Sequence, residues 1–143
     1  MSLDGPYEDD NIFARIIKGE IPSAKIYETD RVLAIMDAFP QARGHCLVVH
    51  KTSRARNLLD AEPETLDELI TAVQKIARGV RTALKPDGLV ITQFNGTAAG
   101  QTVFHLHFHI IPRVEGEALG RHGGGMADMA ELERLAREIA GAL

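Results

Sequence analysis

Apolar residues recur three and four positions apart in three parts of the chain, and this spacing predicts three helices. The first helix is expected within residues 10–19, capped by Asp10 and ended by Gly19. A longer apolar stripe predicts a helix over residues 63–84, and a third predicts a closing helix over about residues 126–142. The apolar face of the first helix consists of Ile12, Phe13, Ile16 and Ile17.

Short runs of apolar and β-branched residues predict five strands between and after these helices. Residues 24–37 form a predicted hairpin that turns at "ETDR", and single strands are expected over residues 45–50, 89–94 and 102–111. We found no internal repeat. The order of these segments predicts an α+β fold, an antiparallel sheet of about five strands with helices mainly on one face.

Composition limits the organisation of the chain and its compartment. The 143 residues, 45% of them hydrophobic, suit one domain, which we place over residues 10–143. Residues 1–9 are polar and aperiodic, which predicts a disordered tail. Cys46 is the only cysteine and lies in an apolar run, so we expect a buried free thiol and a reducing, cytoplasmic location.

Charge and hydropathy exclude two classes of partner. A formal net charge of −4, 5% aromatic residues and no tryptophan argue against a groove that follows a nucleic-acid backbone. No uncharged apolar run approaches the roughly 20 residues that a membrane span needs, and the start "MSLDGPYEDD" lacks the apolar core of a signal peptide. We therefore expect no nucleic acid and no membrane among its partners.

The run "HLHFH" carries the strongest chemical signal. Because side chains alternate along a strand, His105, His107 and His109 share one face, while the apolar residues between them share the other. One such histidine would suit an ordinary solvated face. Three histidines on alternate residues indicate a functional site.

Two kinds of chemistry fit three such histidines. A metal could bind an adjacent pair with a third ligand from elsewhere, such as His45 or His50, but the spacings typical of zinc sites are missing. Alternatively, one imidazole attacks an electrophile while its other nitrogen is held by an acceptor, and the middle residue, His107, is best placed for this role. The preceding loop favours a phosphorus centre, since it offers polar side chains and glycine N–H groups to an anion. These residues are Asn95, Gly96, Gly100, Gln101 and Thr102.

At this point the sequence resembles a known family. "HLHFHII", preceded by "GEIP" and by "MDAFPQARGH", is similar to the signature of the histidine triad (HIT) superfamily, and residues 10–113 resemble its Hint branch. The resemblance implies a HIT-like fold that dimerises into a ten-stranded sheet. It also implies a purine nucleotide (AMP-like) substrate and hydrolysis or transfer at its α-phosphate, without a cofactor.

The resemblance also assigns roles to individual residues. His107 matches the nucleophile, the backbone carbonyl of His105 its orienting group, and His109 a phosphate ligand. His45 matches a fourth active-site histidine, and Asp37 matches the acid that binds the ribose. The implied base pocket consists of Ile12, Phe13, Ile16, Ile35 and Leu47. The implied contacts to phosphate and leaving group are Asn95, Gly100, Gln101, Thr102 and Val103.

Departures from the family pattern define what is not expected. Some relatives hold a structural zinc, but Asn11, Ala14 and Ser53 or Arg54 stand where two cysteines and a histidine would be needed, so we predict no metal. His50 is assigned no role. Three other functions stay open: a dinucleoside polyphosphate hydrolase, a nucleotide- or partner-binding protein with incidental hydrolysis, and a histidine-rich metal module.

Overall fold

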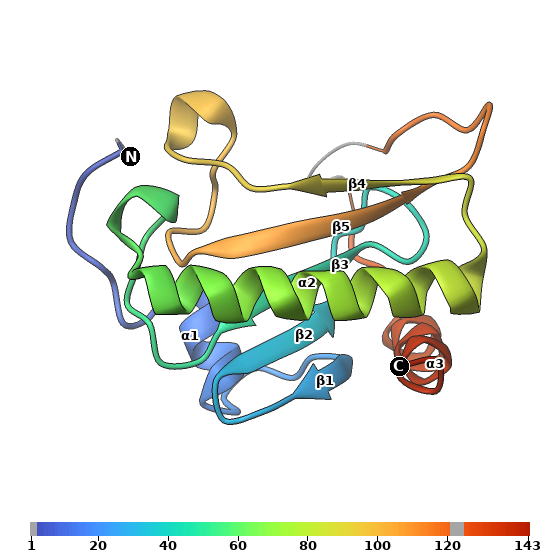
Figure 1. Cartoon of the computed structure of the whole chain (residues 1–143), viewed down its shortest axis with the longest axis horizontal. Helices are drawn as coiled ribbons and strands as arrows, with labels where there is room; N and C mark the ends of the chain where they lie inside the picture. The colour runs from blue at the N-terminus through green and yellow to red at the C-terminus, as the bar shows by residue number, and fades with distance from the viewer. Residues whose placement is uncertain (1–2, 121–124) are drawn as a thin grey trace.

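The fold is built on a five-stranded antiparallel sheet in the order β1-β2-β3-β5-β4 (Figure 1). The computed structural model describes residues 3–120 and 125–143. The strands are β1 (Lys25–Glu28), β2 (Val32–Met36), β3 (Cys46–His50), β4 (Gly88–Thr92) and β5 (His107–Arg113). The helices are α1 (Ile12–Ile17), α2 (Pro63–Leu84) and α3 (Met129–Ala140), with short 3-10 turns η1 (Leu58–Asp60) and η2 (Thr97–Ala99). The predicted α+β fold is confirmed.

Alternation along the central strands divides the core into two parts. Cys46 and Val48 of β3 face the larger core, which α2 and α3 cover, whereas Leu47 and Val49 face the opposite side. On that side they pack with Phe13 and other residues of α1. The longer helices therefore share one face of the sheet, as predicted, and the shorter α1 leaves room beside it on the other.

Several boundaries differ from the prediction by a few residues. The side chain of Asn11, not Asp10, caps α1, because its Oδ1 accepts the N–H of Ala14 at 2.9 Å. Helix α3 is shorter than the apolar pattern suggested. Strand β5 begins at His107 and not at residue 102, because its partner β3 ends at His50 and the last pair between them is Val49 with His107.

Residues 3–9 lie against the domain, which differs from the disordered tail that their polarity suggested. The Asn57 side chain donates to the Leu3 carbonyl (3.0 Å), and the Arg56 guanidinium donates to the Pro6 carbonyl (2.9 Å). Backbone carbonyls accept hydrogen bonds in every residue type. The composition of the segment therefore did not indicate these contacts. Among the described residues, no helix is long and apolar enough to cross a bilayer.

Candidate active site

The tautomer of His107 is set by the main chain. His107 is 8% exposed, and its Nδ1 lies 2.6 Å from the carbonyl oxygen of His105. A carbonyl only accepts, so Nδ1 carries the proton and donates it. The lone pair of His107 is therefore on Nε2, the arrangement that a nucleophilic imidazole needs.

His105 precedes the strand, and its two ring nitrogens contact residues of other segments. Its Nε2 donates to the carbonyl of His50 at 3.0 Å, which leaves Nδ1 to accept the hydroxyl of Tyr7 at 2.6 Å. Burial lowers the pKa of His105 to about 4 and raises the pKa of Tyr7. Both shifts favour the neutral forms that these hydrogen bonds require.

His45 and His109 form a second buried pair. The backbone N–H of Gln41 donates to Nδ1 of His45 (3.0 Å), so the proton of a neutral His45 lies on Nε2. That Nε2 lies 2.9 Å from Nδ1 of His109 and 3.4 Å from Oδ2 of Asp37. Donation to His109 places the proton of His109 on its Nε2.

These contacts bear on the metal alternative. Asp37, His45 and His109 bring one ligand atom each to within 4.8 Å of one another, close enough in distance for a divalent cation. However, a metal needs the Nε2 lone pair of His45, and the Gln41 N–H holds the ring in the opposite tautomer. The hydrogen bonding therefore favours a proton between these groups over a metal ion.

An apolar cavity of about 440 Å³ opens beside His107 and His109. Its size and lining suit a small organic ligand. The ring of Phe13 stands edge-on to His107, with centroids 4.7 Å apart, and the rings of His107 and His109 are 5.0 Å apart. The predicted site residues that line the cavity are Ile12, Phe13, Ile16, Ile35, Asp37, Leu47, Thr102, Val103, His107 and His109.

Comparison with known proteins identifies the family. The family model described as "HIT domain" matches residues 18–116. The chain belongs to the HIT family. "Protein hit" of Bacillus subtilis is 46% identical over 110 residues, 76% of this chain and 75% of that protein. "Adenylylsulfatase HINT3" of Arabidopsis thaliana is 37% identical over 112 residues, 78% of this chain and 56% of that protein. A solved "Hit-like protein involved in cell-cycle regulation" from Bartonella henselae has a TM-score of 0.92 and 50% identity, covering 97% of this chain and all of that one.

Asp37 of this HIT protein combines two contacts. Its Oδ1 accepts the N–H of Phe39 at 2.8 Å, a turn-capping bond, while Oδ2 faces His45. It also lines the cavity. The hydrogen bond from Phe39 therefore fixes the orientation of the carboxylate at the cavity wall.

Three predicted phosphate contacts do not reach the cavity of the HIT domain. Buried Gln101 accepts the N–H of Gly96 (2.8 Å) and donates to the carbonyls of Arg56 (2.7 Å) and Val103 (3.0 Å). Asn95 accepts the N–H of Leu58 (3.0 Å). Gly100 closes a turn, with its N–H 3.0 Å from the Thr97 carbonyl. These residues brace the loop before β5, and the loop composition could not reveal which way they point.

The cavity also has a wall that the sequence did not indicate. Met129 and Leu132 of α3 line it, together with Met126 just before the helix and Phe39. The helical spacing of Met129 and Leu132 is equally typical of buried core, so the pattern alone could not assign them to a cavity. The segment after Arg113, where the resemblance ends, thus contributes to the site.

The buried neutral His105 predicts a loss of stability of the HIT domain in acid. In the unfolded chain the His105 ring is protonated near its ordinary pKa of 6.5, whereas in the folded chain it is protonated only near pH 4. The unfolded state therefore binds this proton more tightly, and stability falls as the pH falls from 6.5 to 4. We expect a loss of about 3 kcal/mol between about pH 7 and pH 4 from this group. Urea unfolding at both pH values measures it. Between these pH values, the free energy of unfolding of His105→Asn should fall by about 3 kcal/mol less than that of the wild type. An equal fall in both proteins would contradict the prediction.

Proposed function

We propose that this protein is a nucleotide hydrolase or transferase that acts on the α-phosphate of purine nucleoside phosphoramidates, or of related nucleoside monophosphate conjugates. The observation that carries the proposal is the bond from His107 Nδ1–H to the His105 carbonyl, which leaves Nε2 of a cavity-lining imidazole as a nucleophile. Membership of the HIT family and the similarity to an adenylylsulfatase support a nucleotide-binding hydrolase.

The first step forms a covalent intermediate. Nε2 of His107 attacks phosphorus, the P–N bond of the phosphoramidate breaks, and the leaving nitrogen takes up a proton to depart as an amine. The exposed hydroxyl of Thr102 lines the cavity and is a route for this proton, whereas His45 does not line it. Holding the two reacting atoms in line supplies several kcal/mol of the barrier.

The second step returns the enzyme to its starting state. Water attacks phosphorus, the bond between phosphorus and Nε2 of His107 breaks, and the nucleoside monophosphate leaves. The Nε2–H of His109 is a donor for charge that develops on the phosphoryl oxygens in both steps. His45 donates to Nδ1 of His109 and so keeps the His109 proton on Nε2, and the Gln41 N–H in turn keeps the His45 proton on Nε2.

Nucleotide binding follows from the rest of the cavity. We assign the base to the apolar pocket around Phe13 and Leu47, and the ribose hydroxyls to Asp37. A purine offers a wide apolar face to such a pocket. Met126 and Met129 extend the apolar wall beyond the residues that the family resemblance implied.

We further propose that two copies of the chain join into a ten-stranded sheet. We also propose that the protein is located in the cytoplasm. Strand β4 pairs with β5 on one side only and is the last strand of the sheet, and its Val90 and Ile91 are each 42% exposed. An exposed apolar edge strand favours pairing with another strand. The molecular mass of the protein in solution tests whether it is a dimer. The buried free thiol of Cys46 is compatible with a reducing compartment.

The proposed function predicts a trapped adduct. Wild-type protein mixed with adenosine 5′-phosphoramidate and quenched in alkali should gain the mass of one adenylyl group and release AMP. Diadenosine tetraphosphate, tested in parallel, should turn over more slowly. Faster turnover of the tetraphosphate would favour the polyphosphate hydrolase, and AMP binding without turnover of either compound would favour a binding protein.

A further inference from the structure

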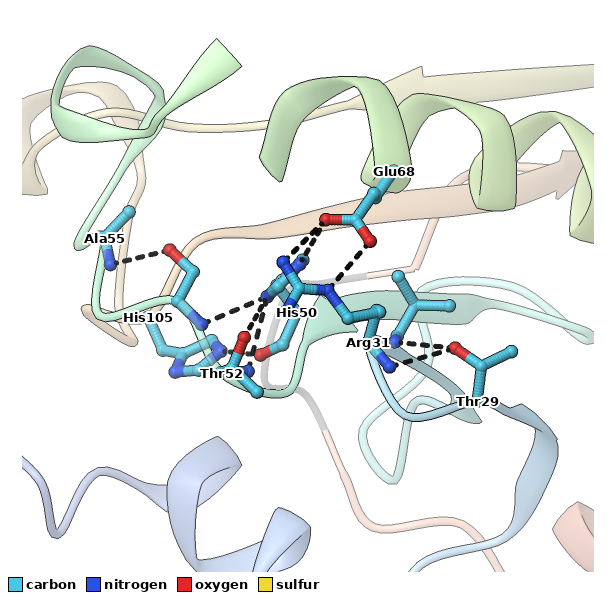
Figure 2. A network of polar contacts seen from close by, with 9 residues as sticks. Thr29, Arg31, His50, Thr52, Ala55, Glu68 and His105 are labelled. Atoms are coloured by element: carbon cyan, nitrogen blue, oxygen red, sulfur yellow. Dashed lines mark hydrogen bonds and ion pairs between the residues drawn. The ribbon is translucent and has the colours of Figure 1, made fainter. Parts of the chain in front are cut away.

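A chain of hydrogen bonds runs from Glu68 on α2 through His50 to the ring of His105 (Figure 2). Its members are Arg31, which follows the turn of the hairpin, Glu68 on α2, His50 at the end of β3, and His105 before β5. None of these four residues lines the cavity. The connection to the nucleophile is made by the carbonyl of His105.

His50, to which the sequence assigned no role, sits at the centre of this chain. It is 1% exposed, and its Nδ1 accepts the backbone N–H groups of Thr52 (3.3 Å) and Ser53 (3.0 Å). Two N–H donors on one nitrogen place the ring proton on Nε2. The ring thus fixes the turn after β3, and this turn directs the His50 carbonyl at Nε2 of His105.

Glu68 completes the set of contacts around His50. Its Oε1 accepts Nε2–H of His50 at 3.1 Å, and Arg31 binds both carboxylate oxygens, at 2.9 and 3.1 Å (Figure 2). Hydrogen bonds from Arg31 and then His50 lower the pKa of Glu68 to about 2. A permanently ionised acceptor therefore holds the buried imidazole.

Tyr7 holds His105 from the opposite side. Its hydroxyl donates to Nδ1 of His105 at 2.6 Å, and the guanidinium of Arg54 lies over its ring, 4.8 Å from the centroid. Both ring nitrogens of His105 are therefore engaged by groups outside the cavity, and its backbone carbonyl holds His107.

We propose that Glu68 and Tyr7 are positioning residues for the reaction at His107. Glu68 acts through His50 and Tyr7 acts directly, and together they fix the ring of His105 so that its carbonyl keeps the Nδ1–H tautomer of His107. This inference rests on the proposed function for its kinetic consequence, but not for its structural one. A misplacement of about 1 Å at a reacting group can cost about 100-fold in rate, so a partial release of His105 is expected to lower kcat.

The test compares disruptive, conservative and control variants in the full chain. Glu68→Ala and Tyr7→Phe should each lower kcat for adenosine 5′-phosphoramidate about tenfold, with KM unchanged within about twofold, because neither residue touches the cavity. Glu68→Gln should recover most of the rate, since its amide oxygen still accepts from His50. Asp67→Asn and Tyr27→Phe are the matched controls and should behave as the wild type.

A second readout needs no substrate. Nitrogen-15 NMR of the imidazole rings should show His107 as the Nδ1–H tautomer in the wild type and in the controls, and a mixture of tautomers in Glu68→Ala and Tyr7→Phe. If Glu68→Ala and Tyr7→Phe both had the spectra and rates of the wild type, for example because water replaces the lost groups, the inference would be overturned. Mixed tautomers in a protein whose wild type does not turn over would refute the proposed function and leave the positioning role standing.

Discussion

His107→Ala is expected to abolish turnover of adenosine 5′-phosphoramidate, lowering kcat by at least about 10³-fold, while AMP still binds. The variant lacks the Nε2 lone pair that attacks phosphorus, so no covalent intermediate forms. The apolar part of the cavity around Phe13 and Leu47 is unchanged, and this part supplies most of the contact with the base. Single-turnover kinetics measure the rate, intact mass detects the adduct, and calorimetry measures AMP affinity.

A second variant separates loss of the nucleophile from loss of local structure. In His107→Asn the side-chain amide can still donate to the His105 carbonyl, as Nδ1–H of His107 does at 2.6 Å, but it offers no nucleophilic nitrogen. Both variants should be equally inactive and should unfold at similar urea concentrations. Turnover at the wild-type rate in either variant would show that His107 is not the nucleophile.

Gly44→Ala is expected to lower the free energy of unfolding by about 2 kcal/mol. Gly44 has φ +89°, a conformation that side chains rarely adopt, and a Cβ there would overlap Cδ1 of Leu84 and lie 3.1 Å from Cγ of Pro112. Leu84 ends α2 and Pro112 lies in β5, so the Leu84 side chain would have to rotate away and Pro112 would have to shift slightly. Urea unfolding measures the change.

Gly19→Ala is the matched control for this prediction. Gly19 also has a positive φ, +80°, but a Cβ there would have no neighbour within 4 Å. This variant therefore isolates the backbone strain, at about 1 kcal/mol, from the steric clash. If both variants lost the same stability, the close approach of Leu84 to Gly44 would have no energetic consequence.

Periodicity predicted the sheet and α2 well, because each depends on one buried stripe or one alternating face. The predicted bounds of α2 match the structure at both ends. Strand β5 was predicted too long, since alternation continues through His105 although the neighbouring strand stops at His50. A strand ends where its partner ends, and a pattern within one segment carries no information about its partner.

The cavity lining was predicted better on helices and strands than in loops, where Asp37, Thr102 and Val103 line the cavity but Asn95, Gly100 and Gln101 do not. Alternation placed His107 and His109 on one face of a strand, and the family resemblance placed Phe13 and Ile16 at the base pocket; all four line the cavity. Gln101 and Asn95 were expected at the phosphate, but their amides bind loop backbone, and either use suits a polar loop residue. Tyr7 lies almost a hundred positions from His105 in the sequence, so nothing local connects the two.

The backbone partners of the buried imidazoles bear on how this site tolerates mutation. The carbonyls of His50 and His105 and the N–H of Gln41 fix three tautomers. A carbonyl survives every substitution of its own side chain, and an N–H survives all but proline. Substitutions at His50, His105 or Gln41 therefore leave these backbone partners in the chain. The side chains that position those segments, such as Glu68 and Tyr7, are where mutation can adjust the nucleophile by degrees, whereas loss of the His107 imidazole ends the reaction in one step.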